Sequence, residues 1–86
     1  MNSTRLRELR AGKRASLGTL GAVIGKSVVS YGKKERGEVP FKPEEVLALS
    51  KFYDLSFNEM NAIFYDSKLP IGNYDDFRIV IKVLGT

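Results

Sequence analysis

The chain has 86 residues, of which 43% are hydrophobic and 28% charged, a composition typical of one small globular domain. It contains neither cysteine nor histidine. These absences exclude disulfide bonds, a thiolate metal site and an imidazole base, so we expect no cofactor and no enzymatic activity. No apolar run is long enough to cross a membrane, and the first residues lack a signal-peptide pattern. We therefore expect a cytoplasmic protein that does not contact membranes.

The charge is divided unevenly along the chain. Residues 1–37 hold nine basic and two acidic residues, a net charge of +7. Residues 38–86 hold five basic and eight acidic residues, a net charge of −3. A strongly basic segment of this kind predicts that the N-terminal part of the chain faces a polyanion such as nucleic acid.

The first 37 residues predict three short helices. Residues 3–14 place Leu6 and Leu9 on one face, which is typical of an amphipathic helix. Serines precede the next two predicted helices, 17–23 and 28–36, and are suitable N-caps. Gly25, between these two helices, can supply the left-handed backbone of a tight turn.

Two further helices are predicted in the middle of the chain. After a connection over residues 38–43, Pro43 suits the first turn of a fourth helix that ends near Tyr53. Ser56 and Glu59 have the spacing of a capping box, which predicts a fifth helix beginning at Phe57. These elements complete a predicted domain over residues 1–66.

Residues 67–86 show a different pattern. Turn-forming residues precede a β-branched stretch, 77–84, in which apolar residues alternate with others, and this alternation predicts a β-strand or hairpin extension. The alternating face consists of Phe77, Ile79, Ile81 and Val83. A single strand is not stable alone, so it must pair either with residues 63–69 or with a strand of a second subunit. The expected fold class is therefore mainly α, with five helices and a short C-terminal β extension.

Two short helices joined by a glycine-containing turn, the second helix being basic, form a helix-turn-helix candidate. A wider resemblance rests on five segments. In the first half of the chain they are Leu6-Arg7-Glu8-Leu9-Arg10, residues 16–25, and residues 27–37, which end in Lys34-Glu35-Arg36-Gly37. In the second half they are the Pro40-Phe41 pair and residues 44–64, in which Asp54-Leu55-Ser56 joins the last two helices. In combination, residues 5–65 resemble the Cro/C-type phage repressor family, also called Xre-like helix-turn-helix proteins. The C-terminal segment is similar to that of phage Cro proteins that end in a dimer-forming strand.

The resemblance implies roles for individual residues. The third helix would enter the major groove of DNA, and the positions matching base-edge contacts are Ser27, Val28, Val29, Gly32 and Lys33. The two valines can touch thymine methyl groups, whereas Lys33 can reach guanine or a phosphate. Basic residues placed to meet phosphates are Lys13, Arg14, Lys26, Lys34 and Arg36. Arg10 and Glu35 match a partly buried salt bridge between the first and third helices of similar repressors.

These patterns predict a sequence-specific, double-stranded DNA-binding transcriptional regulator, a Cro-like repressor of a phage or prophage genetic switch. It would act as a homodimer joined through the C-terminal strand. An alternative is a protein-interaction module that binds and modulates a partner repressor. Three features favour this alternative, because an apolar recognition helix suits a protein partner as well as a DNA groove: the two valines, Leu17 in place of the glutamine usual in the family, and the helical glycines Gly18, Gly21 and Gly32.

Overall fold

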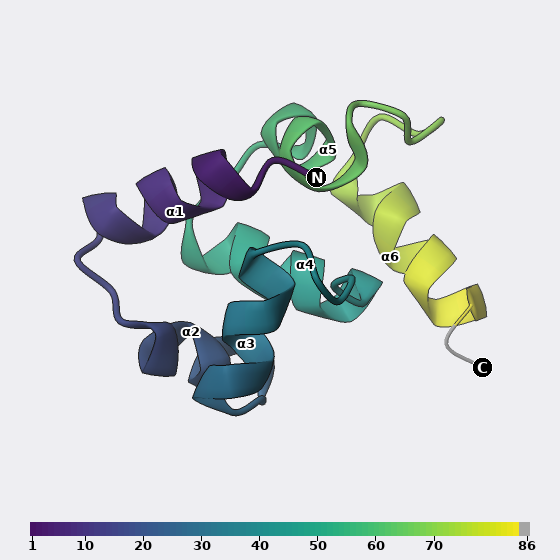
Figure 1. Ribbon diagram of the computed structural model, residues 1–86. Helices are drawn as coiled ribbons and strands as arrows, with labels where there is room; N and C mark the ends of the chain where they lie inside the picture. Colours follow the sequence, from purple (N-terminus) through teal and green to yellow (C-terminus); the bar gives the residue numbers. More distant parts are fainter. Residues whose placement is uncertain (85–86) are drawn as a thin grey trace.

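A computed structural model of the chain describes residues 1–84, which form six α-helices (Figure 1). They are α1 (Ser3–Gly12), α2 (Leu17–Ile24), α3 (Val28–Glu35), α4 (Pro43–Phe52), α5 (Phe57–Tyr65) and α6 (Tyr74–Leu84). The first five lie within a few residues of the ranges predicted from the sequence. Residues 85 and 86, the end of the predicted C-terminal extension, lie outside the described residues.

Serine side chains determine where three of the helices begin. Ser16, Ser27 and Ser56 each accept a hydrogen bond from the backbone N–H three residues later, at 3.0, 3.1 and 3.1 Å. At α5 the Glu59 carboxylate also accepts a hydrogen bond from the Ser56 backbone N–H, at 2.9 Å, which completes the predicted capping box. Hydrogen bonds from Ser56 keep the pKa of Glu59 below its ordinary value.

Each of the six helices contributes to one hydrophobic core. α1 packs against α3 and α5, α2 packs against α3 and α4, and α4 packs against α5. The largest side chains removed from solvent in this core are Leu6, Leu20, Tyr31, Val46, Leu49, Met60 and Phe77. Burial of these side chains supplies the main driving force for folding and orients α3 relative to its neighbours.

The predicted β-strand or hairpin over residues 67–86 is wrong, because residues 74–84 form α6 and residues 1–84 contain no strand. Asn73 caps this helix: its Oδ1 accepts a hydrogen bond from the Asp76 backbone N–H at 2.8 Å, and its Nδ2 donates to the Asp76 carboxylate at 3.2 Å. Tyr74, Phe77 and Ile81 then pack against the core at helical spacing. Capping and packing outweigh the β-propensity of the isoleucines and valines, which is a weak and context-dependent preference.

The change from strand to helix divides the predicted dimerisation face. Phe77 is only 2% exposed and Ile81 is half-buried, so both belong to the core of the domain. Ile79 and Val83 are 60% and 67% exposed and lie on the outer side of α6. The four residues therefore do not form the single surface that the alternation predicted.

Candidate nucleic-acid interface

The turn between α2 and α3 is tightly constrained. Gly25 ends α2 with a φ of +70°, in the left-handed region that glycine adopts without strain. At Gly21 a Cβ atom would lie 2.8 Å from the backbone oxygen of Lys26 and 3.2 Å from that of Ser27. Only a glycine at this position allows such a close approach, and the approach holds the start of α3 against α2.

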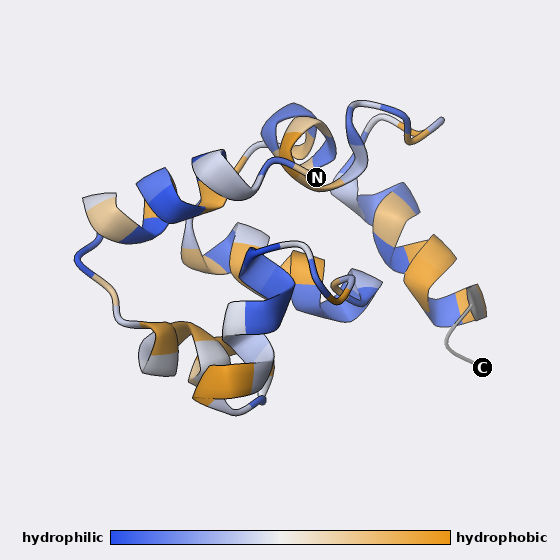
Figure 2. Cartoon of the chain, in the orientation of Figure 1, coloured by the Kyte–Doolittle hydropathy of each residue, from blue (hydrophilic) through white to orange (hydrophobic). Residues whose placement is uncertain are grey.

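The two ends of α3 have different surroundings. In the C-terminal half, Tyr31, Lys34 and Glu35 are at most 5% exposed. At the N-terminal end Val28 and Val29 are 50% and 67% exposed, although both are apolar. Figure 2 shows this first turn as a hydrophobic end of the helix that projects away from α1 and α5. An exposed apolar turn at the end of a helix that packs in the core elsewhere indicates a contact surface.

Spacing along α3 places a cation on the same side as this apolar turn. Val29 and Lys33 are four residues apart, so their side chains lie one above the other on one helix face, and both are exposed. Ser27, which caps the helix, is exposed as well. Val29 and Lys33 thus share one exposed face of α3, whereas Ser27 and Val28 are exposed at its N-terminal end.

Gly32 does not join this surface. It is buried, and a Cβ atom on it would lie 3.1 Å from Nη1 of Arg36. The guanidinium of Arg36 therefore covers the position that the sequence predicts to face a base edge. A glycine here gives the arginine side chain room to lie back along the helix.

Exposed basic side chains surround the helix-turn-helix segment. Lys26 and Arg14 are exposed, and Lys13 lies over the ring of Phe52 with its Nζ 5.1 Å from the ring centre. Arg36 forms an exposed ion pair with Glu38, which keeps the pKa of that carboxyl below its ordinary value. These side chains are placed where they can contact a polyanion.

Lys34, predicted to contact phosphate, lies elsewhere. Its ammonium is buried and forms an ion pair with Glu45 of α4, at an Nζ–Oε1 distance of 2.5 Å. The same Glu45 oxygen also accepts a hydrogen bond from the Lys42 backbone N–H at 2.8 Å. Lys34 therefore links α3 to α4, and its buried charge is not available to a ligand.

Arg10 and Glu35 lie against each other, as the resemblance implied. The Nε of Arg10 is 3.0 Å from Oε2 of Glu35, and Nη2 is 3.0 Å from Oε1, which is bidentate geometry. The Glu35 side chain is 4% exposed and the Arg10 side chain 24% exposed. The hydrogen bond to Glu35 raises the pKa of the Arg10 guanidinium above its ordinary value. This pair ties α1 to the buried half of α3.

Two buried tyrosines lie beside this ion pair. Burial raises the pKa of Tyr53 to about 12, and the Glu35 carboxylate acts in the same direction. Burial also raises the pKa of Tyr31, again with a contribution from Glu35. The hydroxyl groups of both tyrosines lack a hydrogen-bond partner within the described part of the chain. Both side chains stay neutral at physiological pH and serve as packing groups.

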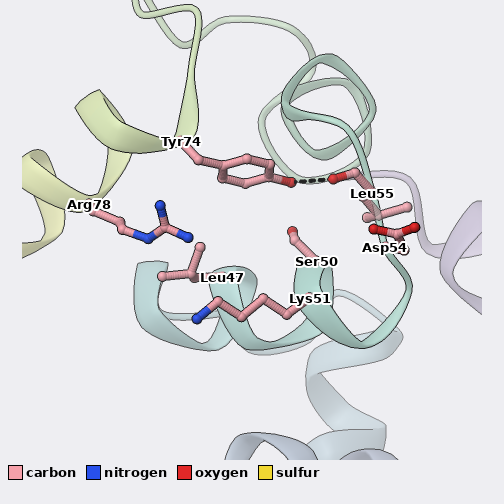
Figure 3. A pocket seen from close by; sticks show the side chains of 7 residues that line it. All are labelled: Leu47, Ser50, Lys51, Asp54, Leu55, Tyr74 and Arg78. Atoms are coloured by element: carbon pink, nitrogen blue, oxygen red, sulfur yellow. Dashed lines mark hydrogen bonds between the residues drawn. The ribbon is translucent and has the colours of Figure 1, made fainter.

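A small open pocket lies between α4 and the start of α6 (Figure 3). The Tyr74 hydroxyl donates a hydrogen bond to the backbone oxygen of Leu55 at 2.8 Å and so fastens α6 to the domain. Lys51, Asp54 and Arg78 also line this pocket, which α6 shares with α4 and not with α3.

No helix within residues 1–84 is long and apolar enough to span a membrane. Over the same range, no three aspartate or glutamate side chains are grouped in a way that could hold a metal ion.

Sequence reasoning missed two features of this region. The Lys34–Glu45 ion pair joins residues eleven positions apart on different helices, so no local pattern could predict it. The helical state of residues 74–84 did have a signal, because Asn73 and Asp76 have the spacing of an N-cap and its N3 partner. The alternation of apolar residues concealed this signal.

A comparison with protein families agrees with this geometry. A family model described as a helix-turn-helix domain, of the Xre/Cro-like kind, matches residues 3–63. The chain belongs to this helix-turn-helix family. The match covers α1 to α5 as far as Ile63 and excludes α6. Membership supports a DNA-binding function for the chain. Searches of curated proteins and of solved structures gave no match.

Proposed function

We propose that this helix-turn-helix protein is a sequence-specific transcriptional regulator that inserts α3 into the major groove of double-stranded DNA. The observation that carries this proposal is the exposure along α3: Val28 and Val29 at its N-terminal end and Lys33 one turn after Val29 are open to solvent, while the rest of the helix is held in the core. A helix held in this way can enter a groove without disturbing the core.

In this proposal some exposed residues contact base edges and others contact phosphates. Ser27 and Lys33 make polar contacts with base edges, and the two valines contact thymine methyl groups. Lys13, Arg14, Lys26 and Arg36 meet phosphates, which gives affinity that depends on salt but not on sequence. Lys34 and Gly32 have no DNA contact, because both are buried.

The test is a selection of duplexes from a random library, followed by fluorescence anisotropy with the selected duplex and a scrambled one. We expect the selected duplex to bind more tightly, and binding to weaken steeply as salt rises. Lys33→Ala should weaken binding about tenfold. Lys68→Ala, which removes an exposed lysine from the loop before α6, is the matched control and should change little. Failure to select any duplex, or binding to a partner repressor without a duplex preference, would contradict the proposal.

Methyl recognition has a separate test. Replacing thymine by uracil in the selected duplex removes only the C5-methyl groups, and we expect affinity to fall about fourfold for each methyl that contacts a valine. The Val28→Ala, Val29→Ala double variant should bind the two duplexes with nearly equal affinity. If this variant retains the full preference for thymine, the valines do not read the methyl groups.

The resemblance to Cro-like proteins supports a more specific role. We propose that the chain acts as a repressor that blocks transcription by occupying its site, as in the genetic switch of a phage or prophage. A reporter gene placed behind the selected duplex should be expressed less when the wild-type protein is present, and Lys33→Ala should relieve this repression.

A further inference from the structure

A space for one methyl group lies where the start of α2 meets the start of α3. A Cβ atom on Gly18 would lie 3.5 Å from Cγ2 of Val28 and 3.6 Å from the Ser16 hydroxyl oxygen. Both are ordinary van der Waals distances, and outside the backbone of α2 and the chain neighbours of Gly18 no other described atom would lie within 4 Å. The bare glycine therefore leaves a notch, which we call the Gly18 notch, with Val28 as its apolar wall.

The Gly18 notch lies at the end of α3 that the proposed function places in the major groove. Val28 is 50% exposed and the next residue, Val29, is 67% exposed, whereas Gly18 is half-buried. α2 and α3 pack directly against each other, and the close approach of Gly21 to the backbone of Lys26 holds them together. The notch is thus formed between two helices whose spacing is fixed.

A methyl group in the major groove fits this notch. Pyrimidine bases carry such a group at C5: thymine always has it, and cytosine has it only after methylation. Because C5 has the same place in both bases, the methyl group projects into the groove at the same position. Its contact with Val28 removes apolar surface of both groups from water, which favours the methylated base. Cytosine without the methyl group leaves the notch unfilled.

Lys33 distinguishes between the two pyrimidines that carry a methyl group. It lies one turn after Val29 on the same exposed face of α3. An ammonium group only donates hydrogen bonds. The guanine that pairs with cytosine offers it two adjacent acceptors, O6 and N7, whereas the adenine that pairs with thymine places an amino donor beside its N7. The combination of the Gly18 notch and Lys33 therefore matches a pair of 5-methylcytosine with guanine better than a pair of thymine with adenine.

We propose that the preferred ligand of this protein is double-stranded DNA that contains 5-methylcytosine, with the methyl group in the Gly18 notch against Val28. Lys33 binds the guanine of the same or the neighbouring base pair. This inference rests on the proposed insertion of α3 into the major groove, and it adds that the methylation state of the DNA controls binding. It also gives a function to Gly18, a glycine inside a helix, because any side chain at this position would occupy the notch.

Fluorescence anisotropy with modified duplexes tests the inference. The duplex selected by the wild-type protein is prepared with cytosine, 5-methylcytosine or thymine at each pyrimidine position in turn, always opposite the complementary purine. At one or more positions we expect 5-methylcytosine to bind about fourfold more tightly than cytosine, from the burial of one methyl group, and more tightly than thymine. Equal affinity for cytosine and 5-methylcytosine at every position would overturn the inference, and so would tighter binding of thymine where the methyl group is preferred. The proposed function would survive either result, as long as the selected duplex binds more tightly than the scrambled one.

Gly18→Ala separates the notch from the rest of the interface. The added methyl group makes only ordinary contacts and alanine favours a helix more than glycine, so we expect the variant to keep its fold in thermal unfolding and its affinity for the unmethylated duplex. Its preference for 5-methylcytosine should fall from about fourfold to below about twofold. Gly12→Ala, where a Cβ atom would meet nothing within 4 Å, is the matched control and should keep the full preference.

Val28→Thr tests the notch independently, without a change in α2. It replaces one methyl group of the apolar wall by a hydroxyl at similar volume, so the preference for 5-methylcytosine should fall here as well. Full preference in either Gly18→Ala or Val28→Thr would overturn the assignment of the methyl group to the Gly18 notch.

Discussion

Local sequence signals predict the structure of α1 to α5 correctly, but they disagree with one another over the C-terminal helix α6. In the first region, caps, turn glycines and apolar spacing all agree on helices, and the chain follows them. In α6 the apolar residues alternate as in a strand, but Asn73 starts a helix and the core accepts Tyr74, Phe77 and Ile81 at helical spacing. A β-branched sequence therefore adopts the structure that its neighbours can bury.

Phe77→Ala should have the largest effect, because it weakens the attachment of α6 to the rest of the domain. Phe77 is 2% exposed and lies against the rings of Phe57 and Tyr65, so its removal should cost about 4 kcal/mol of the free energy that holds α6 on the domain. We expect amide hydrogen exchange to rise strongly in α6 and much less in α2. An equal rise in both helices would indicate that α6 and the domain unfold as one unit. Ile79→Ala, on the outer face, is the control.

Lys34→Ala should have the next largest effect, within the helix-turn-helix domain. It leaves the buried carboxylate of Glu45 without its cation, which should lower the free energy of unfolding by about 3 kcal/mol in urea denaturation. Lys33→Ala, one position earlier but exposed, should change this free energy by less than about 0.5 kcal/mol.

A double variant shows whether the lost stability comes from the unpaired carboxylate. Lys34→Met combined with Glu45→Gln removes both buried charges, so most of the lost stability should return. If the double variant is no more stable than Lys34→Ala, the cost comes from lost packing and not from the unpaired carboxylate.

Alkaline pH should produce the smallest effect. Burial raises the pKa of Tyr53 from 10.0 to about 12, so the unfolded chain loses this proton before the folded protein does. The stabilisation is complete below about pH 10 and is lost as the pH rises toward 12, at about 1 kcal/mol per pH unit. Tyr53→Phe should match the wild type at pH 7 and lose less stability between pH 9 and 11 in thermal unfolding. Equal losses in the two proteins would contradict this assignment.

The sequence predicted the helices α1 to α5, and it predicted where α3, the proposed DNA-contacting helix, begins. Where α3 begins, and so which of its residues lie in its first turn, could be predicted because the cap and the glycine turn are local signals. The burial of Lys34 could not be predicted, because a lysine next to Lys33 on a basic helix gives no sign that it is buried against another helix. The burial of Gly32 could not be predicted for a similar reason, since its environment depends on the path of the Arg36 side chain.

What the sequence alone determined are the features set by neighbouring residues: where α1 to α5 begin, the turn at Gly25 and the basic character of the first 37 residues. Tertiary structure alone decided the burial of Lys34 and the division of the apolar residues of α6 between core and surface. For residues 74–84, packing at helical spacing decided between a local helix cap and a strand-like alternation. The physical reason is that caps and turns are formed by bonds within a few residues. Burial, in contrast, depends on which helices meet, and no local pattern contains that information.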